Sequence, residues 1–422
     1  MRAYKRCATV APPSSSPPWA SLPGDLVQQI AWRVLAGELH GYVRFRAVCT
    51  RWRSGTVRPH GRGVTDQRFH PRRWTMLSVG QPGHGRKLTI RFFNLDTAIY
   101  VRVKLPLLRN HRVLDSVDGL LLLVRVRDTA VRLLNPFTGD IAELPPLATL
   151  LTQGDIPDLG QPDERSRWFS ITYNISATVS HDAAGITTVM LAFPCLARVA
   201  VATSNDRQWT MSSWKFPIDV ERISFRGNLY MVRNPSPTIS QIFQIDPHVK
   251  AVGTRQPSPP WLVATCPPDI LSSYIHLVDC DSEEIFVVGC SNICYSRILV
   301  YQLADLMLGR LLPITSIGER AIFMEERTMC VSSKMLPTVM AGTVVYTDRR
   351  EDRREESGYY ARYHLLTGTR SRVVEPGPSS LNCNAMSCSM RNLWNKSWMT
   401  FSITGHQKHG CLLWMVERLF CY

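Results

Sequence analysis

The stretch that decides the fold class runs from Leu120 to Gly139 and reads LLLLVRVRDTAVRLLNPFTG. Two apolar runs, at 120–126 and 130–134, have the length and composition of β-strands. Asn135 and Pro136 then start a turn, and Gly139 can adopt the positive φ that closes a hairpin. The stretch therefore predicts consecutive strands joined by tight turns.

The same combination of an apolar strand and a turn recurs further along the chain. It is found at Phe243–Pro247, Val300–Asp305 and Tyr363–Gly368, at intervals of roughly 60 residues, against ~50 for a kelch blade. Further strands are expected at Trp168–Val179, Thr187–Phe193, Arg222–Phe225, Leu229–Val232, Gln241–Ile245, Tyr274–Val278, Ile285–Val288, Arg297–Leu303, Arg320–Met324, Thr343–Thr347 and Tyr359–Leu365. No long helical stripe intervenes, which argues against an α/β fold. Radially repeated small sheets would protect so many strand edges, so we expect a β-propeller, with a β-sandwich array as the alternative.

The N-terminal region has the helical period instead. Leu22, Leu26, Ile30 and Val34 recur at i+4, and Val27, Ala31 and Leu35 widen the stripe. A second stripe contains Phe45, Val48, Cys49 and Trp52, with arginines between them. Helices of this size form too small a core to stand alone, so we expect a partner surface to complete it.

These patterns divide the chain into five parts. We expect a disordered Pro/Ser leader at 1–18, a helical module at 19–55, a linker at 56–87, a β-propeller-like domain at 88–375, and a closing strand or atypical tail at 376–422. The predicted fold class is thus α+β and multi-domain, with a small all-α module followed by a mainly-β, kelch-like domain. No apolar run is long enough to span a bilayer, and no secretory signal is present.

The charge is concentrated in the first 75 residues, which carry 13 Lys and Arg against three acidic residues, while the whole chain has a net charge of +15. A basic face of this kind can dock an acidic protein or a nucleic acid. The 12 cysteines show no repeating spacing, so we interpret them as reduced thiols in the cytoplasm or nucleus.

Two segments, WASLPGDLVQQI at 19–30 and VRFRAVCTRWRS at 43–54, together resemble an F-box. The remainder, with VLDSVDGLLL at 113–122 and LLNPFTG at 133–139, resembles the strand-rich domain of plant F-box proteins with kelch-like propellers. The resemblance implies a substrate receptor of an SCF-type ubiquitin ligase, acting in protein degradation. Its F-box would bind a Skp-family adaptor and, through it, a cullin, while the β domain would select an unknown protein for ubiquitination.

The residues expected to bind the adaptor are those of the apolar stripes: Leu22, Pro23, Leu26, Ile30, Val34, Val43, Phe45, Val48, Cys49 and Trp52. Arg44, Arg46, Arg51 and Arg53 could steer an acidic adaptor. The alternatives are that the apolar side chains pack on the chain's own β domain, or that the protein binds nucleic acid through its Arg-rich N-terminal segment. The second rests on charge alone, because no nucleic-acid-binding motif is present.

No catalytic, cofactor or metal motif stands out. The chain has no phosphate-binding loop, nucleophile elbow or His-Glu-x-x-His motif, so we expect a protein that is not an enzyme. His406, His409 and Cys411 do not have the spacing of a zinc module, and Cys290 and Cys294 are interpreted as packing residues. The charged run 349–356 is expected to be a solvated loop, and Trp168, Trp209, Trp214 and Trp261 are expected in the core.

Overall fold

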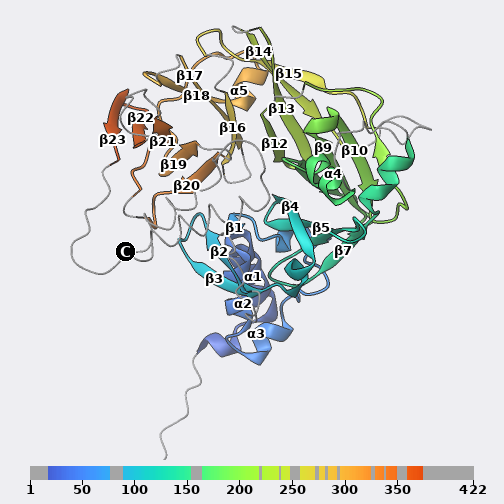
Figure 1. The fold of residues 1–422 in the computed structure, drawn as a ribbon. Coiled ribbons are helices and arrows are strands. Elements are labelled where there is room, and N and C mark those ends of the chain that lie inside the picture. The colour runs from blue at the N-terminus through green and yellow to red at the C-terminus, as the bar shows by residue number, and fades with distance from the viewer. Residues whose placement is uncertain are drawn as a thin grey trace, which may run out of the picture.

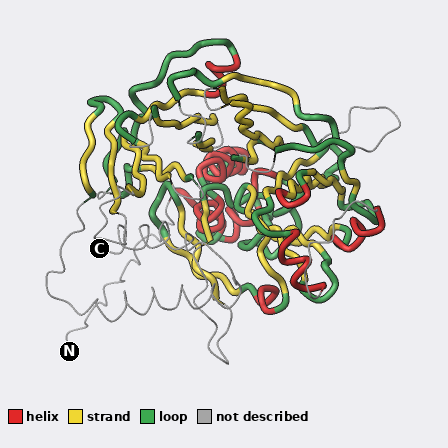
Figure 2. Tube along the Cα trace, turned by 45° about the horizontal axis from the view of Figure 1, so that its top comes forward, coloured by secondary structure: helices red, strands yellow, loops and turns green. Residues whose placement is uncertain are grey.

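The computed structural model describes residues 18–76, 89–153, 164–217, 221–236, 239–247, 257–270, 275–280, 284–291, 295–324, 328–336, 339–348 and 359–373. In this part of the chain six β-sheets follow one another around a ring, and the colour gradient of Figure 1 passes once around it. Helix is the minor component, as Figure 2 shows. The predicted propeller is confirmed, with six blades, and the sandwich array is wrong.

We name the six sheets blades A to F in chain order. Blade A has the order β1-β2-β3, blade B β4-β5-β6-β7, and blade C β11-β10-β9-β8. The strands of these blades are β1 Trp74–Met76, β2 Thr89–Asn94, β3 Tyr100–Lys104, β4 His111–Val117, β5 Leu120–Arg125, β6 Val131–Leu134, β7 Ile141–Leu144, β8 Ser176–His181, β9 Thr187–Phe193, β10 Arg198–Thr203 and β11 Thr210–Met211.

Blade D has the order β12-β13-β14-β15, blade E β16-β17-β18, and blade F β20-β19-β21-β22-β23. The pairing is antiparallel except between β19 and β21. The strands are β12 Arg222–Phe225, β13 Asn228–Ser236, β14 Ile239–Ile245, β15 Trp261–Thr265, β16 His276–Cys280, β17 Glu284–Cys290, β18 Ile298–Gln302, β19 Arg320–Met324, β20 Met329–Ser332, β21 Thr343–Asp348, β22 Tyr359–His364 and β23 Thr369–Arg372.

Each pair of neighbouring blades shares an apolar core. Buried side chains of blades A and B form one cluster, those of B and C a second, C and D a third, D and E a fourth, and E and F a fifth. The sixth cluster joins Phe93 and Leu95 of blade A to Ala321 and Phe323 of blade F. The ring is therefore closed by packing on all six sides, which leaves no blade with a bare apolar face.

The repeated turn of the sequence falls at equivalent places in the ring. It follows β6 in blade B, β14 in blade D, β18 in blade E and β22 in blade F. These are the third strands of blades B, D and E, and the penultimate strand of blade F. The segment therefore marks the same step of the blade in four of the six repeats, although in blade E the residues after β18 form helix α5, Leu303–Met307, and not a turn.

Two sequence expectations are wrong. The segment expected as one strand at Trp168–Val179 divides into the end of helix α4, Glu164–Ile171, and strand β8. The expected linker at 56–87 contains η2, Gln67–Phe69, and β1, which pairs with β2, so residues 56–76 belong to the folded structure. The other helical elements between the strands of the propeller are η3 Pro106–Arg109, η4 Leu147–Gln153, η5 Pro194–Leu196 and α5 Leu303–Met307.

The four tryptophans expected in the core differ in burial. Trp209 and Trp168 are buried, Trp214 is half-buried, and Trp261 is exposed. The leader up to residue 17, the charged run 349–356, the His406, His409 and Cys411 group, and the segment 376–422 lie outside the described residues. No helix among the described residues is long and apolar enough to cross a membrane.

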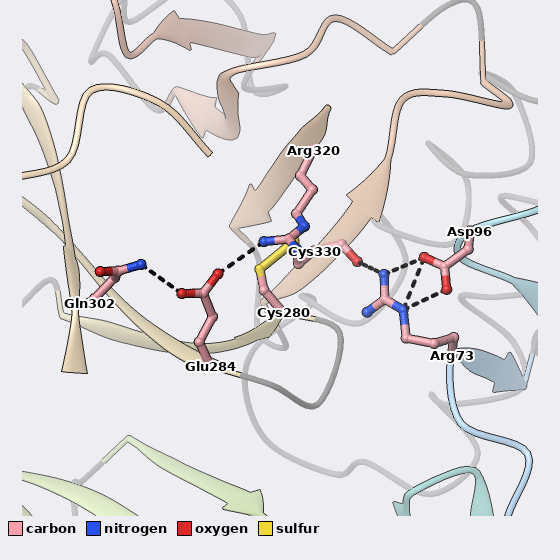
Figure 3. Close-up of a disulfide and its surroundings, with 7 residues drawn as sticks. All are labelled: Arg73, Asp96, Cys280, Glu284, Gln302, Arg320 and Cys330. Atoms are coloured by element: carbon pink, nitrogen blue, oxygen red, sulfur yellow. Dashed lines mark hydrogen bonds and ion pairs between the residues drawn. A yellow bond between two sulfur atoms is a disulfide. The ribbon is translucent and has the colours of Figure 1, made fainter. Parts of the chain in front are cut away.

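The seams on the two sides of blade F carry a disulfide and a polar network (Figure 3). Cys280 at the end of β16 is bonded to Cys330 of β20, with the two Cα atoms 5.5 Å apart. The Cys330 carbonyl accepts a 2.9 Å hydrogen bond from Arg73, which also pairs with Asp96 at 2.8 Å. The expectation of reduced thiols is therefore wrong for Cys280 and Cys330, because neighbouring inner strands bring together two cysteines that lie 50 residues apart.

A second ion pair crosses the same side of the ring. Glu284 of β17 accepts from Arg320 of β19 at 3.0 Å and from Gln302 of β18 at 2.7 Å (Figure 3). Together with the disulfide, this pair joins blade E to blade F. The Arg73 contacts join blade F to blade A.

We expect reduction of the disulfide to lower the free energy of unfolding by about 2 to 4 kcal/mol, because the bond limits the freedom of the unfolded chain. Urea denaturation with and without dithiothreitol measures the difference. A Cys280→Ser, Cys330→Ser variant should be insensitive to the reductant. Equal stability of the oxidised and reduced wild-type protein would contradict the expectation.

Candidate functional site

The N-terminal helices form a compact module beside blades A and B (Figure 1). They are η1 Pro18–Ser21, α1 Gly24–Gly37, α2 Leu39–Arg46 and α3 Thr50–Ser54. Glu38 separates α1 from α2 in an extended conformation, and its carboxylate accepts from the Gly41 backbone N–H at 2.9 Å. The second helix thus begins with Glu38 as its N-cap.

One side of the module is buried against the chain itself. Val27, Ala31 and Leu35 of α1 are buried, and Ala31 and Leu35 form a cluster with Leu39, Tyr42 and Phe69. Phe137, from the turn between β6 and β7, packs against this cluster. This side of the module therefore packs on the chain's own structure, and Val34 and Phe45, two of the residues expected to bind an adaptor, lie partly buried against the same cluster.

Polar contacts fix the module to the propeller. Asn135, which is 0% exposed, donates from its side chain to the carbonyls of Gly63 at 2.8 Å and Phe69 at 3.0 Å. Asp140 accepts from the backbone N–H groups of Gly61 and Gly63. The turn at 135–140, which the sequence identifies only as a turn, thus holds the segment that follows the helices.

A buried histidine lies in the same segment. His70 donates from Nε2 to the Val64 carbonyl at 2.9 Å, and its ring lies 5.3 Å from that of His181 in blade C. Burial lowers the pKa of His70 to about 4 and, together with the neighbouring His70, that of His181 to about 4. Both rings are therefore neutral at pH 7.

Acid should loosen this contact. Because the pKa of His70 in the fold lies below its ordinary value, the unfolded chain binds the proton more readily, and stability falls as the pH drops from 6.5 towards 4. We expect a loss of up to about 3 kcal/mol from this group. Urea denaturation at pH 7.5 and pH 5 measures it, and His70→Gln should reduce the difference. An unchanged difference in His70→Gln would contradict the assignment.

The module also has exposed apolar side chains. Five large ones are open to solvent: Trp19 at 64%, Leu26 at 41%, Ile30 at 37%, Val43 at 48% and Val48 at 62%. Leu26 and Ile30 are one turn apart on α1, so they project from the same side of the helix. We call these five residues the open face.

None of the ten residues expected to bind an adaptor is buried. Five are exposed, namely Pro23, Leu26, Ile30, Val43 and Val48. The other five are half-buried, namely Leu22, Val34, Phe45, Cys49 and Trp52. Phe45 and Trp52 stack with ring centroids 4.4 Å apart. Trp52 donates from Nε1 to the Trp19 carbonyl at 3.2 Å, which brings η1 next to α3. Trp19 is a member of the open face that the sequence analysis did not select.

The arginines of the module differ in their availability. Arg46 donates to the carbonyls of Thr56 and Val57 and lies over the Tyr42 ring, so the expectation that it steers an adaptor is replaced by a structural role. Arg44, Arg51 and Arg53 are exposed. No group of three or more His, Cys, Asp and Glu residues that could hold a metal ion occurs among the described residues.

The closed ring of six blades defines the chain as a β-propeller protein, a class consistent with protein interaction and substrate recognition. The profile of the KIB1-4 beta-propeller family matches residues 92–361. The chain belongs to this family.

Two solved structures are similar to this chain at 11% identity. One is titled "Crystal structure of Nidogen/Laminin Complex"; the match has a TM-score of 0.31 and covers 70% of this chain and 90% of that chain. The other is the Cps50 (Swd1) beta-propeller domain of Myceliophteria thermophila, with a TM-score of 0.29 and coverage of 72% and 81%. No curated protein matches the sequence.

Proposed function

We propose that this protein is the substrate-recognition subunit of an SCF-type E3 ubiquitin ligase. Residues 19–55 act as the F-box and bind a Skp-family adaptor, and through it a cullin. The propeller selects a target protein for ubiquitination. In this role the protein is not itself an enzyme, and it works in the cytoplasm or nucleus.

The observation that carries the proposal is the open face. A small helical module already buries one side on its own chain, yet Leu26, Ile30 and Val43 remain exposed on other positions of the same helices. Burying each such side chain contributes about 1.5 to 3 kcal/mol before the costs of association. Exposed apolar groups gathered on so small a module are typical of a protein-binding surface.

The attachment of the module to the propeller supports the same role. Asn135 and Asp140 fix the segment 61–69 to blade B, and Asn94 of blade A donates to Glu38 at 3.4 Å. A ligase receptor has to hold its target at a defined position relative to the adaptor. A module that is packed and hydrogen-bonded to two blades would provide such a position.

Reconstitution tests the proposal. The purified full-length chain is mixed with a Skp-family adaptor and a cullin, and the mixture is analysed by size-exclusion chromatography in reducing buffer, which matches the cytoplasm and nucleus. We expect a stable ternary complex. Failure to bind the adaptor, together with nucleic-acid binding that weakens steeply with salt, would favour the alternative function.

A further inference from the structure

The antiparallel order of blade B gives it two ends with different surroundings. The turn between β4 and β5 lies against Pro71, since a Cβ on Gly119 would overlap the Pro71 carbonyl. The turn between β6 and β7 holds the segment after the helices through Asn135. Because successive strands alternate in direction, the turn between β5 and β6 lies at the opposite end of the blade. Residues 125–130 therefore face away from the helical module.

A hollow of about 720 Å³ opens at that end. A 3.1 Å hydrogen bond from the Val126 N–H to the Asn110 carbonyl joins the two loops that form it. Its lining consists of Arg109, Asn110, Arg125, Val126, Arg127 and Asp128. Three guanidinium groups thus surround the hollow, against a single carboxylate.

The one carboxylate is already neutralised. Asp128 is paired with Arg125 through two hydrogen bonds, at 2.7 and 2.5 Å. Arg109 and Arg127 are exposed, and no described carboxylate pairs with either. Two guanidinium groups with five donors each are therefore free to bind an anion.

The dimensions of the hollow favour a peptide over a nucleic acid. A cavity of this size holds a few side chains, and exposed Val126 adds an apolar contact to its lining. Single-stranded nucleic acids are usually held by a long basic groove with aromatic platforms, but no aromatic side chain lines this hollow. Guanidinium groups pair equally well with carboxylates and phosphates.

We propose that this hollow binds an anionic peptide segment, with Arg109 and Arg127 pairing with its carboxylate or phosphate groups. The inference rests on the proposed function, because it specifies the class of target segment that the propeller selects. The peptide then lies on the end of the propeller that faces away from the adaptor-binding module.

Fluorescence anisotropy tests the proposal with the full-length chain and two labelled, end-capped decapeptides. One alternates glutamate with glycine, and the other replaces the glutamates by phosphoserines. The peptide that the parent protein binds more tightly is then used for the variants. We expect an Arg109→Glu, Arg127→Glu variant to bind this peptide at least about 10-fold more weakly at 150 mM salt. An Arg109→Lys, Arg127→Lys variant should retain part of the affinity, since charge persists without the planar fork.

The matched control is an Arg102→Glu, Lys104→Glu variant. Both residues are exposed on β3, and the two substitutions change the net charge by the same amount. We expect less than a twofold loss from it. Equal losses in the two variants, or tighter binding of a single-stranded decanucleotide than of either peptide, would overturn the proposal. All variants should still capture the adaptor; if the parent fails to do so but binds the peptide, the proposed function fails and the anion site stands.

Discussion

Replacing Leu26 and Ile30 together by Asp is expected to weaken binding of the Skp-family adaptor by about 100-fold or more. Both side chains are exposed on the same side of α1, so the substitutions remove apolar contacts from the open face and place two carboxylates in it. Desolvating unpaired charges in an interface costs several kcal/mol. Biolayer interferometry with immobilised adaptor measures the change.

The loss of binding can be assigned to the open face only if the Leu26→Asp, Ile30→Asp variant still folds. Leu26 and Ile30 are outside the buried cluster of the module, so the melting temperature should change little. A control variant, Gln28→Glu with Ala36→Glu, adds the same charge at exposed positions of α1 that are neither three nor four residues from Leu26 or Ile30, and it should bind normally. Wild-type affinity in the folded Asp variant would show that the adaptor does not use the open face.

The second large effect is expected from Asn135→Ala, which should lower the free energy of unfolding by about 4 to 6 kcal/mol. The wild-type side chain donates to the carbonyls of Gly63 and Phe69, and its oxygen accepts from the N–H groups of Phe137 and Thr138. The substitution leaves buried carbonyls without donors and removes one of the contacts that attach the helical module to blade B. Urea denaturation measures the loss, and limited proteolysis within 57–68 reports on the attachment.

Asn135→Asp separates the two roles of this side chain. It keeps the acceptors for the turn, but it replaces the donors by a buried carboxylate oxygen that faces the carbonyls of Gly63 and Phe69, so its stability at pH 7 should be equal to or lower than that of Asn135→Ala. Asn205→Ala, at an exposed asparagine in the loop after β10, should have little effect. A loss below about 1 kcal/mol in Asn135→Ala would refute the assigned contacts.

The propeller could be predicted from the sequence because its repeated signal is local. An apolar third strand and the turn after it depend on neighbouring residues only, so the segments in blades B, D and E are recognisable individually. The outer strands were missed because they are short and mixed in character. Strand β7, for example, has four residues and only one of them is buried.

The features that could not be predicted from the sequence depend on contacts between segments that lie far apart along the chain. Leu26 and Val27 belong to one apolar stripe, and only the docking of Phe69 and Phe137 on one side of α1 determines which side stays open. The bond between Cys280 and Cys330 depends on two inner strands lying side by side. The basic hollow likewise requires the loop at 109–110 to meet the turn at 125–128, which no spacing in the sequence predicts.

The central claim is that the open face is the adaptor-binding surface. Hydroxyl-radical footprinting of the full-length chain, alone and bound to a Skp-family adaptor, tests it most directly. We expect oxidation of Trp19, Leu26, Ile30 and Val43 to fall in the complex, while exposed Leu308 near blade E remains equally reactive. Unchanged oxidation of the open face in a complex that has formed would contradict the claim.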